Sequence, residues 1–299
     1  ILVVLVHSIL KIGWSELVTA IPSQPLFYLL FAAAYAIPPC FDWFFYHRWW
    51  GIGWRAIAIF LRKRIMNETL ISYSGDTYLL LWATGRLGIR HEPGRAAPLL
   101  GRNGSDGLDP RRNPFAAIKD VAITSGLAGN GVTLLMLLLA LALGGGDVLS
   151  SSLDAGTLRT IAIGFGALVA VNIAIVLFRG RVMSLSEQET RWLFLVQLFR
   201  VLLNHALILL SWYVVMPEIA FSGWIVLGAI RMVMSRLPLP NKELLFAAVS
   251  GTLTGGASVE VAALMFVQGA LHILCHGIAW AAAMLIDPTG EHDGEARTG

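Results

Sequence analysis

The stretch FSGWIVLGAIRMVMSRLPLPNKELLFAAVSGTLTGG covers residues 221–256 and is apolar enough for a lipid bilayer, but the sequence LPLP at 237–240 interrupts it. Neither side of this break has the roughly 20 apolar residues that a spanning helix needs. Proline lacks a backbone N–H and stops a helix. Interrupted backbone is tolerated at membrane depth only where protein or water covers it. The pattern therefore predicts a re-entrant hairpin, two short helices that enter the membrane and return to the same side. A single kinked spanning helix is the alternative.

The composition of the whole chain indicates a polytopic integral membrane protein. Its 299 residues are 56% hydrophobic and only 14% charged, and the mean hydropathy is +0.69, whereas a soluble domain carries about 25% charged residues. The net charge of +3 is not typical of nucleic-acid binding, because the basic residues lie in loops beside apolar segments. We therefore expect no nucleic-acid partner. Cys40 and Cys275 lie in apolar segments and are expected to be small buried hydrophobic residues.

Long apolar segments predict an all-α bundle of about six spanning helices. The basic residues between 48 and 112 and between 179 and 191 are expected on the cytoplasmic side of a multi-pass membrane protein. The chain begins inside an apolar run, so we expect that its first helix has lost its beginning. The predicted spans are 1–10, 25–46, 119–144, 158–178, 191–216 and 259–286.

Two broken segments predict an internal symmetry within the single transmembrane domain. Each follows a span and has the same order: a short basic amphipathic helix, a break and a short apolar helix. The two hairpins are expected to open from opposite sides, which predicts an inverted repeat of the kind found in transporters. The first half covers residues 1–118 and contains a hairpin at 51–88 and a cytoplasmic loop at 89–114. The second half covers residues 119–286 and contains a hairpin at 221–256. Residues 287–299 form a polar tail.

The run from Trp192 to Gly256 resembles the C-terminal half of the lysylphosphatidylglycerol synthase transmembrane, or flippase-like, family. The resemblance lies in a long apolar span, a short amphipathic helix at 222–235, and a proline-containing turn followed by Glu243. The family usually has a longer glycine-rich turn there. Its Pro-Gly and Gly-Glu signature is missing from the first hairpin, where SGD at 74–76 stands in its place. The resemblance implies a membrane domain that moves lipids or lipid-linked groups between leaflets. Because the longest polar stretch is the loop at 89–114, we expect no synthase activity.

Arg200 lies within a predicted span, where an unpaired charge costs at least about 2.5–3.5 kcal/mol. We therefore expect it to face the interior of the bundle and to meet an acid. The candidate acids are Asp42, Asp120, Glu243 and Glu260. A guanidinium can bind the phosphate of a headgroup through two parallel N–H donors. A purely structural ion pair is the alternative.

Charges on the hairpins complete the predicted substrate site. Arg231 and Arg236 can hold an anionic headgroup, aided by the N-terminus of a helix that begins near Glu243. Alternatively, the two arginines extend to the membrane interface and Glu243 is only a helix cap. In the first hairpin, Asp76 is a further candidate for the substrate site, although the sequence supports it less strongly. The predicted substrate-binding residues are Arg200, Arg231, Arg236, Glu243, Asp76 and Asp42.

His272 and His276 lie on one helix face and can share a metal ion or haem. Hydrogen bonding across a helix interface, with a role in proton coupling, is the favoured interpretation, and no cofactor is predicted. The main hypothesis is a flippase-like transporter that binds membrane lipids and is not an enzyme. A structural subunit of a larger membrane complex, with a membrane-protein partner or as a homo-oligomer, is one alternative. The other is a membrane enzyme acting on lipid-linked substrates, with Asp76 or Glu243 as its base.

Overall fold

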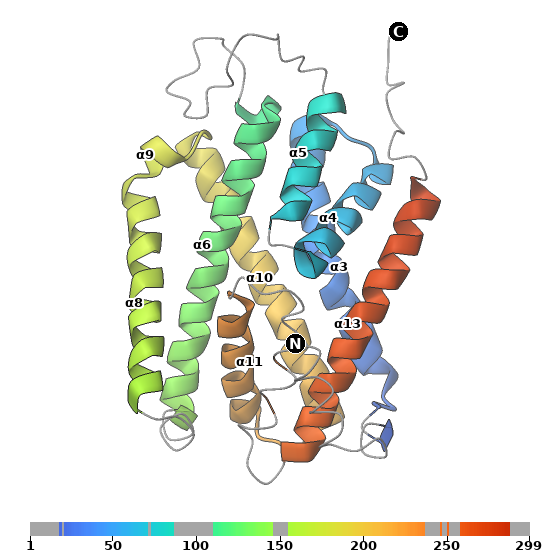
Figure 1. Cartoon of the computed structure of the whole chain (residues 1–299), viewed down its shortest axis with the longest axis vertical. Helices are drawn as coiled ribbons and strands as arrows, with labels where there is room; N and C mark the ends of the chain where they lie inside the picture. The colour runs from blue at the N-terminus through green and yellow to red at the C-terminus, as the bar shows by residue number, and fades with distance from the viewer. Residues whose placement is uncertain are drawn as a thin grey trace. The chain divides into compact units, whose positions relative to one another are not determined.

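The structure is a computed structural model that describes residues 18–19, 21–70, 73–86, 110–145, 155–236, 246, 250 and 258–287. All regular structure in these residues is helical and no strand is present among them, which confirms the all-α fold class (Figure 1). The helices are α3 (Pro25–Trp50), α4 (Ile57–Thr69), α5 (Ser74–Arg86), α6 (Pro114–Ala140), α8 (Ala155–Leu177), α9 (Arg179–Val182), α10 (Glu187–Val215), α11 (Phe221–Ser235) and α13 (Ser258–Ile286). The described residues also contain short turns of 3-10 helix, at Trp54–Ala56 and Pro110–Arg112, and one turn of π-helix, at Leu141–Gly145.

Within the described residues, 4 helices are long and apolar enough to cross a membrane. They are α3, α6, α10 and α13, and they overlap the predicted spans 25–46, 119–144, 191–216 and 259–286. Helix α8 covers the predicted span 158–178. The long apolar helices indicate a membrane-embedded protein. The predicted span 1–10 lies outside the described residues, so the total of about six spans and the inverted repeat stay predictions.

The chain divides into two compact units. Long helices such as α3 contribute residues to both of them, so each unit draws on both predicted halves of the sequence. Unit 1 contains Ile1–Ile37, Gly131–Gly166 and Val201–Ile278, and unit 2 contains Pro38–Asn130, Ala167–Arg200 and Ala279–Gly299.

Helix α3 continues through Pro38 and Pro39. A proline inside a helix removes the hydrogen bond to the carbonyl four residues earlier, so Pro38 leaves the carbonyl oxygen of Ala34 without its helical donor. The side-chain amide of Asn204, on α10, donates to this oxygen at 2.6 Å. Asn204 therefore replaces the hydrogen bond that the proline removes.

Aromatic side chains form the core of unit 2. The rings of Tyr46 and Phe60 stack with centroids 5.5 Å apart and an angle of 5° between their planes. Phe45 meets Trp192 edge to face at 5.9 Å. Tyr46, Phe60 and Phe45 are fully buried. This cluster holds together the parts of α3, α4 and α10 that carry the charged residues described below.

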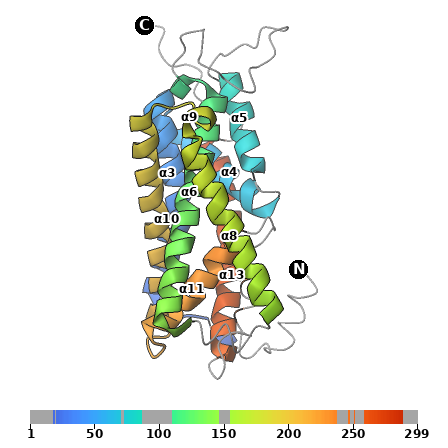
Figure 2. The same cartoon turned by 90° about the vertical axis from the view of Figure 1, so that its left-hand side faces the viewer.

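Helices α4 and α5 form the first hairpin, and they lie side by side in both views (Figures 1 and 2). A side chain at Gly75 would overlap the backbone carbonyl of Lys63, so only glycine permits this approach. The Asn67 side chain, on α4, joins the two arms, since its Oδ1 accepts from Gly75 N–H at 2.7 Å. The turn contains Tyr73, with φ +72°.

Helix α11 corresponds to the first arm of the predicted second hairpin; it has 15 residues and is too short to span a bilayer. Its Gly228 packs against the ring of His205 on α10. The proline turn at 237–240 and Glu243 lie outside the described residues, so their roles stay predictions.

The prediction that both cysteines are buried is wrong, because Cys40 is exposed on α3 and Cys275 is only half-buried on α13. An apolar side chain on a spanning helix can face lipid as readily as the interior, since lipid tails are as apolar as the protein core.

Candidate functional site

Four charged side chains form a buried network in unit 2. Lys63 Nζ lies 2.6 Å from Asp42 Oδ2 and 3.2 Å from Asp76 Oδ1. Arg200 Nη1 lies 3.6 Å from Asp42 Oδ1. The exposed fractions of the side chains are 8% for Lys63, 10% for Asp42, 17% for Asp76 and 13% for Arg200. Helices α3, α4, α5 and α10 each supply one member, and the formal charges sum to zero.

Uncharged polar groups hold the ends of this network. Asn67 Nδ2 donates to Asp76 Oδ2 at 3.0 Å, and Arg200 Nη2 donates to Ser125 Oγ at 2.7 Å. Buried ions need such additional hydrogen bonds, because their mutual attraction alone repays the loss of water only in favourable geometry. The network is therefore anchored by α6, through Ser125, as well as by the hairpin.

The Lys63 ammonium is held in its charged form. Burial lowers the pKa of Lys63, but the carboxylates of Asp42 and Asp76 raise it by more, through their charges and through hydrogen bonds, so the net shift is upward. A lysine with a raised pKa is protonated at neutral pH. The site therefore presents a permanent cation.

Lys63 lies between two further cations on α4, and each of the three has its own acid. Arg62 Nη1 lies 3.6 Å from an Asp287 carboxylate oxygen, and Arg64 Nε lies 3.1 Å from Glu68 Oε1. Arg62 also donates to the carbonyl oxygens of Ala283, at 3.2 Å, and Asp287. It thereby caps the C-terminus of α13, where helical carbonyls lack donors and a positive charge is favoured.

Two buried polar side chains next to the network have no hydrogen-bond partner among the described residues. Tyr46 lies one turn after Asp42 on α3, and Gln197 lies one turn before Arg200 on α10. Both are fully buried, and the Tyr46 hydroxyl and both amide atoms of Gln197 are unpaired. An unpaired buried polar group costs about 1–3 kcal/mol. Such groups therefore suggest that a polar ligand or water binds here.

The structure brings together three of the predicted site residues: Asp42, Asp76 and Arg200. Of the four acids considered for Arg200, Asp42 is its partner. Asp120 has a different role, because its Oδ2 accepts from the backbone N–H groups of Ser184, at 2.8 Å, and Leu185, at 2.7 Å. Asp120 thereby fixes the segment that leads into α10.

Arg231 lies on α11 and Arg236 directly follows the end of this helix; both belong to unit 1 and are not members of the unit 2 network. Arg236 Nε donates to Thr133 Oγ1 on α6 at 3.3 Å, and Thr133 is fully buried. Also in unit 1, Tyr35 Oη and His276 Nδ1 are 2.7 Å apart. This contact between α3 and α13 confirms the predicted hydrogen bond across a helix interface.

Three polar residues at this site, Lys63, Tyr46 and Gln197, were not predicted from the sequence. A signal for Lys63 was present, since three consecutive cations on a short helix cover too wide an arc for all of them to face outward. Tyr46 and Gln197 gave no signal, because a single tyrosine or glutamine in an apolar helix resembles an ordinary interfacial or packing residue.

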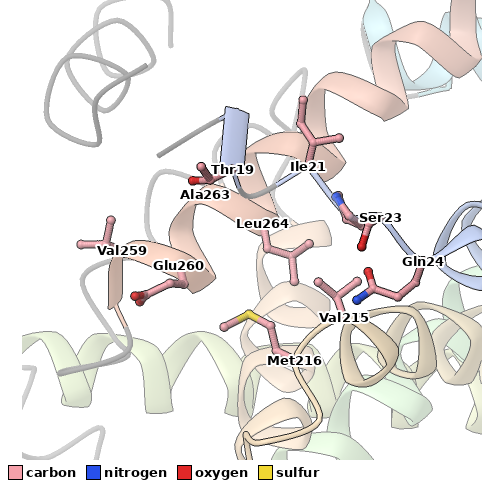
Figure 3. Close-up of a pocket in the computed structure, with 11 residues that line it drawn as sticks. Thr19, Ile21, Ser23, Gln24, Val215, Met216, Val259, Glu260, Ala263 and Leu264 are labelled. Atoms are coloured by element: carbon pink, nitrogen blue, oxygen red, sulfur yellow. The ribbon is translucent and has the colours of Figure 1, made fainter. Parts of the chain in front are cut away.

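A separate cavity of about 570 Å³ lies in unit 1 (Figure 3). The segment 21–24, the end of α10 and the first turns of α13 enclose it. Ser23 and Gln24 give it polar atoms, and Leu264 and Met216 give it apolar ones. Among its lining residues the one formal charge is Glu260. The lining therefore does not supply the cations that a phosphate headgroup needs, and the unit 2 network is the better candidate for such a ligand.

The network must be interpreted from its own chemistry, because no family model, curated protein or solved structure matches the chain. A guanidinium and an ammonium, each held by a carboxylate, can bind an oxyanion if the carboxylate is displaced. The Tyr46 hydroxyl and the Gln197 amide can add hydrogen-bond donors. The site therefore has the donors to bind a phosphate group.

Proposed function

We propose that this protein is a flippase-like transporter of the bacterial inner membrane, which moves a phospholipid or a lipid-linked anionic headgroup between leaflets. The observation that supports this most directly is the buried ion network of Asp42, Lys63, Asp76 and Arg200, built on a short helical hairpin and two long apolar helices. The resemblance to the flippase-like family points to the same class of activity.

The small contribution of buried ion pairs to stability supports a functional role for this network. Replacing a buried ion pair by well-packed apolar residues is often neutral or stabilising, so such pairs are poor stabilising devices. Ionisable residues inside a membrane bundle characteristically mark the pathway of a substrate or ion. Broken helices at the centre of transporters carry such sites, and α4 and α5 have that form.

In the proposed mechanism the headgroup phosphate binds to Arg200 and Lys63, while the acyl chains remain in the surrounding lipid. Arg200 can present two N–H donors in one plane, which suits a phosphate. The Tyr46 hydroxyl and the Gln197 amide, both unpaired and buried, donate to the remaining oxygens. No bond of the lipid is made or broken, so the proposed activity is transport and not enzymatic.

A structural subunit of a larger membrane complex is the second candidate. It is favoured by the pairing of every cation on α4 with an acid: Arg62 with Asp287, Lys63 with Asp42 and Asp76, and Arg64 with Glu68. A network of this kind can hold helices together without binding a ligand. This candidate predicts that loss of Arg200 impairs folding or assembly.

Headgroup accessibility in reconstituted vesicles separates the two candidates. Wild-type protein and Arg200→Ala are reconstituted with a trace of fluorescent phosphatidylglycerol, and a membrane-impermeant quencher is added outside. The transporter predicts that wild type exposes nearly all of the label and Arg200→Ala only about half. Arg179→Ala is the matched control, because its partner Glu187 is 78% exposed and the pair lies outside the network.

The remaining outcomes are also decisive. If wild-type vesicles leave about half of the label protected, transport of this lipid is excluded. If Arg200→Ala is poorly folded by size-exclusion chromatography while wild type is inactive, the structural candidate is supported. If mass spectrometry finds a chemically altered lipid, the enzyme alternative replaces both.

A further inference from the structure

An anionic headgroup that enters the network would disturb its charge balance. Asp42 and Asp76 supply two negative charges, Lys63 and Arg200 supply two positive charges, and each side chain is at most 17% exposed. The network without a ligand is therefore neutral. A headgroup with one negative charge would leave one uncompensated charge in a site with little water, which is strongly unfavourable.

Asp42 is the carboxylate that such a headgroup must displace. Its Oδ2 is bound to Lys63 and its Oδ1 to Arg200, so the two cations share this one side chain. Asp76 is bound by Lys63 and also by the amide of Asn67. A phosphate that takes over both cations therefore leaves Asp42 buried without its partners. A buried carboxylate that loses its cations favours the protonated form.

We propose that Asp42 binds one proton for each anionic headgroup that enters the network, so that headgroup and proton cross the membrane together. This inference rests on the proposed function. Water on one side gives the proton to an Asp42 carboxylate oxygen as the phosphate replaces that oxygen beside Lys63 and Arg200. The proton returns to water on the other side when the headgroup leaves. For a singly charged headgroup the net charge moved is zero.

The charges around Asp42 tie its protonation to the arrival of the headgroup. The Lys63 ammonium and the Arg200 guanidinium place positive charge at the two oxygens of this carboxylate, and the Asp76 carboxylate is held by the same Lys63. The titratable and charged groups at Asp42 are Lys63 and Arg64 of α4, Asp76 of α5, Arg200 of α10 and Tyr46 of α3 itself.

The decisive measurement is the steady-state distribution of fluorescent phosphatidylglycerol between leaflets. Wild-type vesicles receive either a pH gradient of one unit at zero membrane potential or a membrane potential at equal pH. A difference of one pH unit is a tenfold ratio of proton concentrations across the membrane. If one proton crosses with each headgroup, the label should reach about a tenfold ratio between leaflets, because the free energies of the two ratios then balance. The potential alone should have no effect, since no net charge moves.

The opposite result overturns the inference and leaves the proposed function standing: label that follows the potential and ignores the pH gradient shows that the headgroup crosses without a proton. If the label does not cross in either condition, the proposed function fails as well. The two failures are therefore distinguishable within one experiment.

The assignment to Asp42 is tested with Asp42→Asn, which should abolish the response to the pH gradient. Glu187→Gln removes an exposed carboxylate and should keep the full response. A response that persists in Asp42→Asn places the proton elsewhere and overturns the inference. If Asp42→Asn does not fold, infrared spectroscopy of the wild type decides instead: short-chain phosphatidylglycerol should produce the carbonyl band of a protonated carboxyl group, and its absence contradicts the inference.

Discussion

Asn204 donates a hydrogen bond of 2.6 Å to the carbonyl oxygen of Ala34, the atom that Pro38 deprives of its helical donor. The two residues lie on different helices, α10 and α3. Polar side chains in membrane helices often satisfy backbone groups that a proline frees. The asparagine, which is distant in sequence, therefore replaces the helical donor that Pro38 removes.

This relationship predicts a coupling between Pro38 and Asn204. Asn204→Ala should lower the free energy of unfolding by about 1 kcal/mol, because it leaves the Ala34 oxygen unpaired. In a Pro38→Ala background, residue 38 again has an N–H for Ala34, so the same substitution should cost less. Denaturation in mixed micelles of the two single variants and the double variant measures the difference. Equal costs in both backgrounds would contradict this interpretation.

Close packing of α4 against α5 makes Gly75 sensitive to any side chain. Gly75→Ala would place a methyl group on the Lys63 carbonyl, so the hairpin arms must separate, and we expect a loss of about 1–3 kcal/mol in unfolding free energy. Gly85→Ala is the matched control on the same helix, because a side chain there meets nothing within 4 Å. It should be neutral or stabilising by up to about 1 kcal/mol. Equal stability of the two variants in thermal unfolding would show that the approach is looser than described.

The cap that Arg62 forms on α13 predicts a local effect. Arg62→Met keeps a long apolar side chain but removes the donors to Ala283 and Asp287. We expect the amides near the end of α13 to exchange faster by roughly tenfold, which corresponds to about 1.4 kcal/mol of local stability. Arg55→Met, at an exposed position, should leave this exchange unchanged. Hydrogen exchange read by mass spectrometry on the 279–287 peptide provides the test.

Removal of Lys63 should expose the cost of unpaired buried acids. Lys63→Met is expected to destabilise the protein by about 3–5 kcal/mol, because Asp42 and Asp76 lose a common cation. Adding Asp76→Asn removes one unpaired charge and should restore part of the loss. Chemical unfolding of the single and double variants measures the coupling. If the double variant is less stable than Lys63→Met alone, the two residues do not act as an ion pair.

The sequence predicted the helical elements well, since their signals are local. Spanning length, apolar composition and the short charged helices of the first hairpin all follow from runs of neighbouring residues. The contact that joins the two arms of this hairpin was not predicted. The Asn67 side chain of α4 binds the backbone of Gly75 across the turn, and the residue pattern within one short helix does not predict a contact with the next.

The candidate site was only partly predictable. A buried Arg200 implied an acid, because the cost of an unpaired charge in a span is general. The choice of Asp42 among four acids, the central place of Lys63, and the unpaired Tyr46 and Gln197 required the fold. Arg231 and Arg236 were predicted to bind the same headgroup as Arg200, but they belong to the other unit.

By itself, the sequence determined that the chain is helical, is apolar enough for a membrane, and contains a short charged hairpin in its first half, because composition and periodicity act over a few neighbouring residues. Only the tertiary structure decided which charges meet. Asp42, Lys63, Asp76 and Arg200 are brought together from four helices, and the close approach that only Gly75 allows sets Lys63 beside Asp76. Electrostatic pairing depends on distance in space, which the order of residues along the chain does not contain.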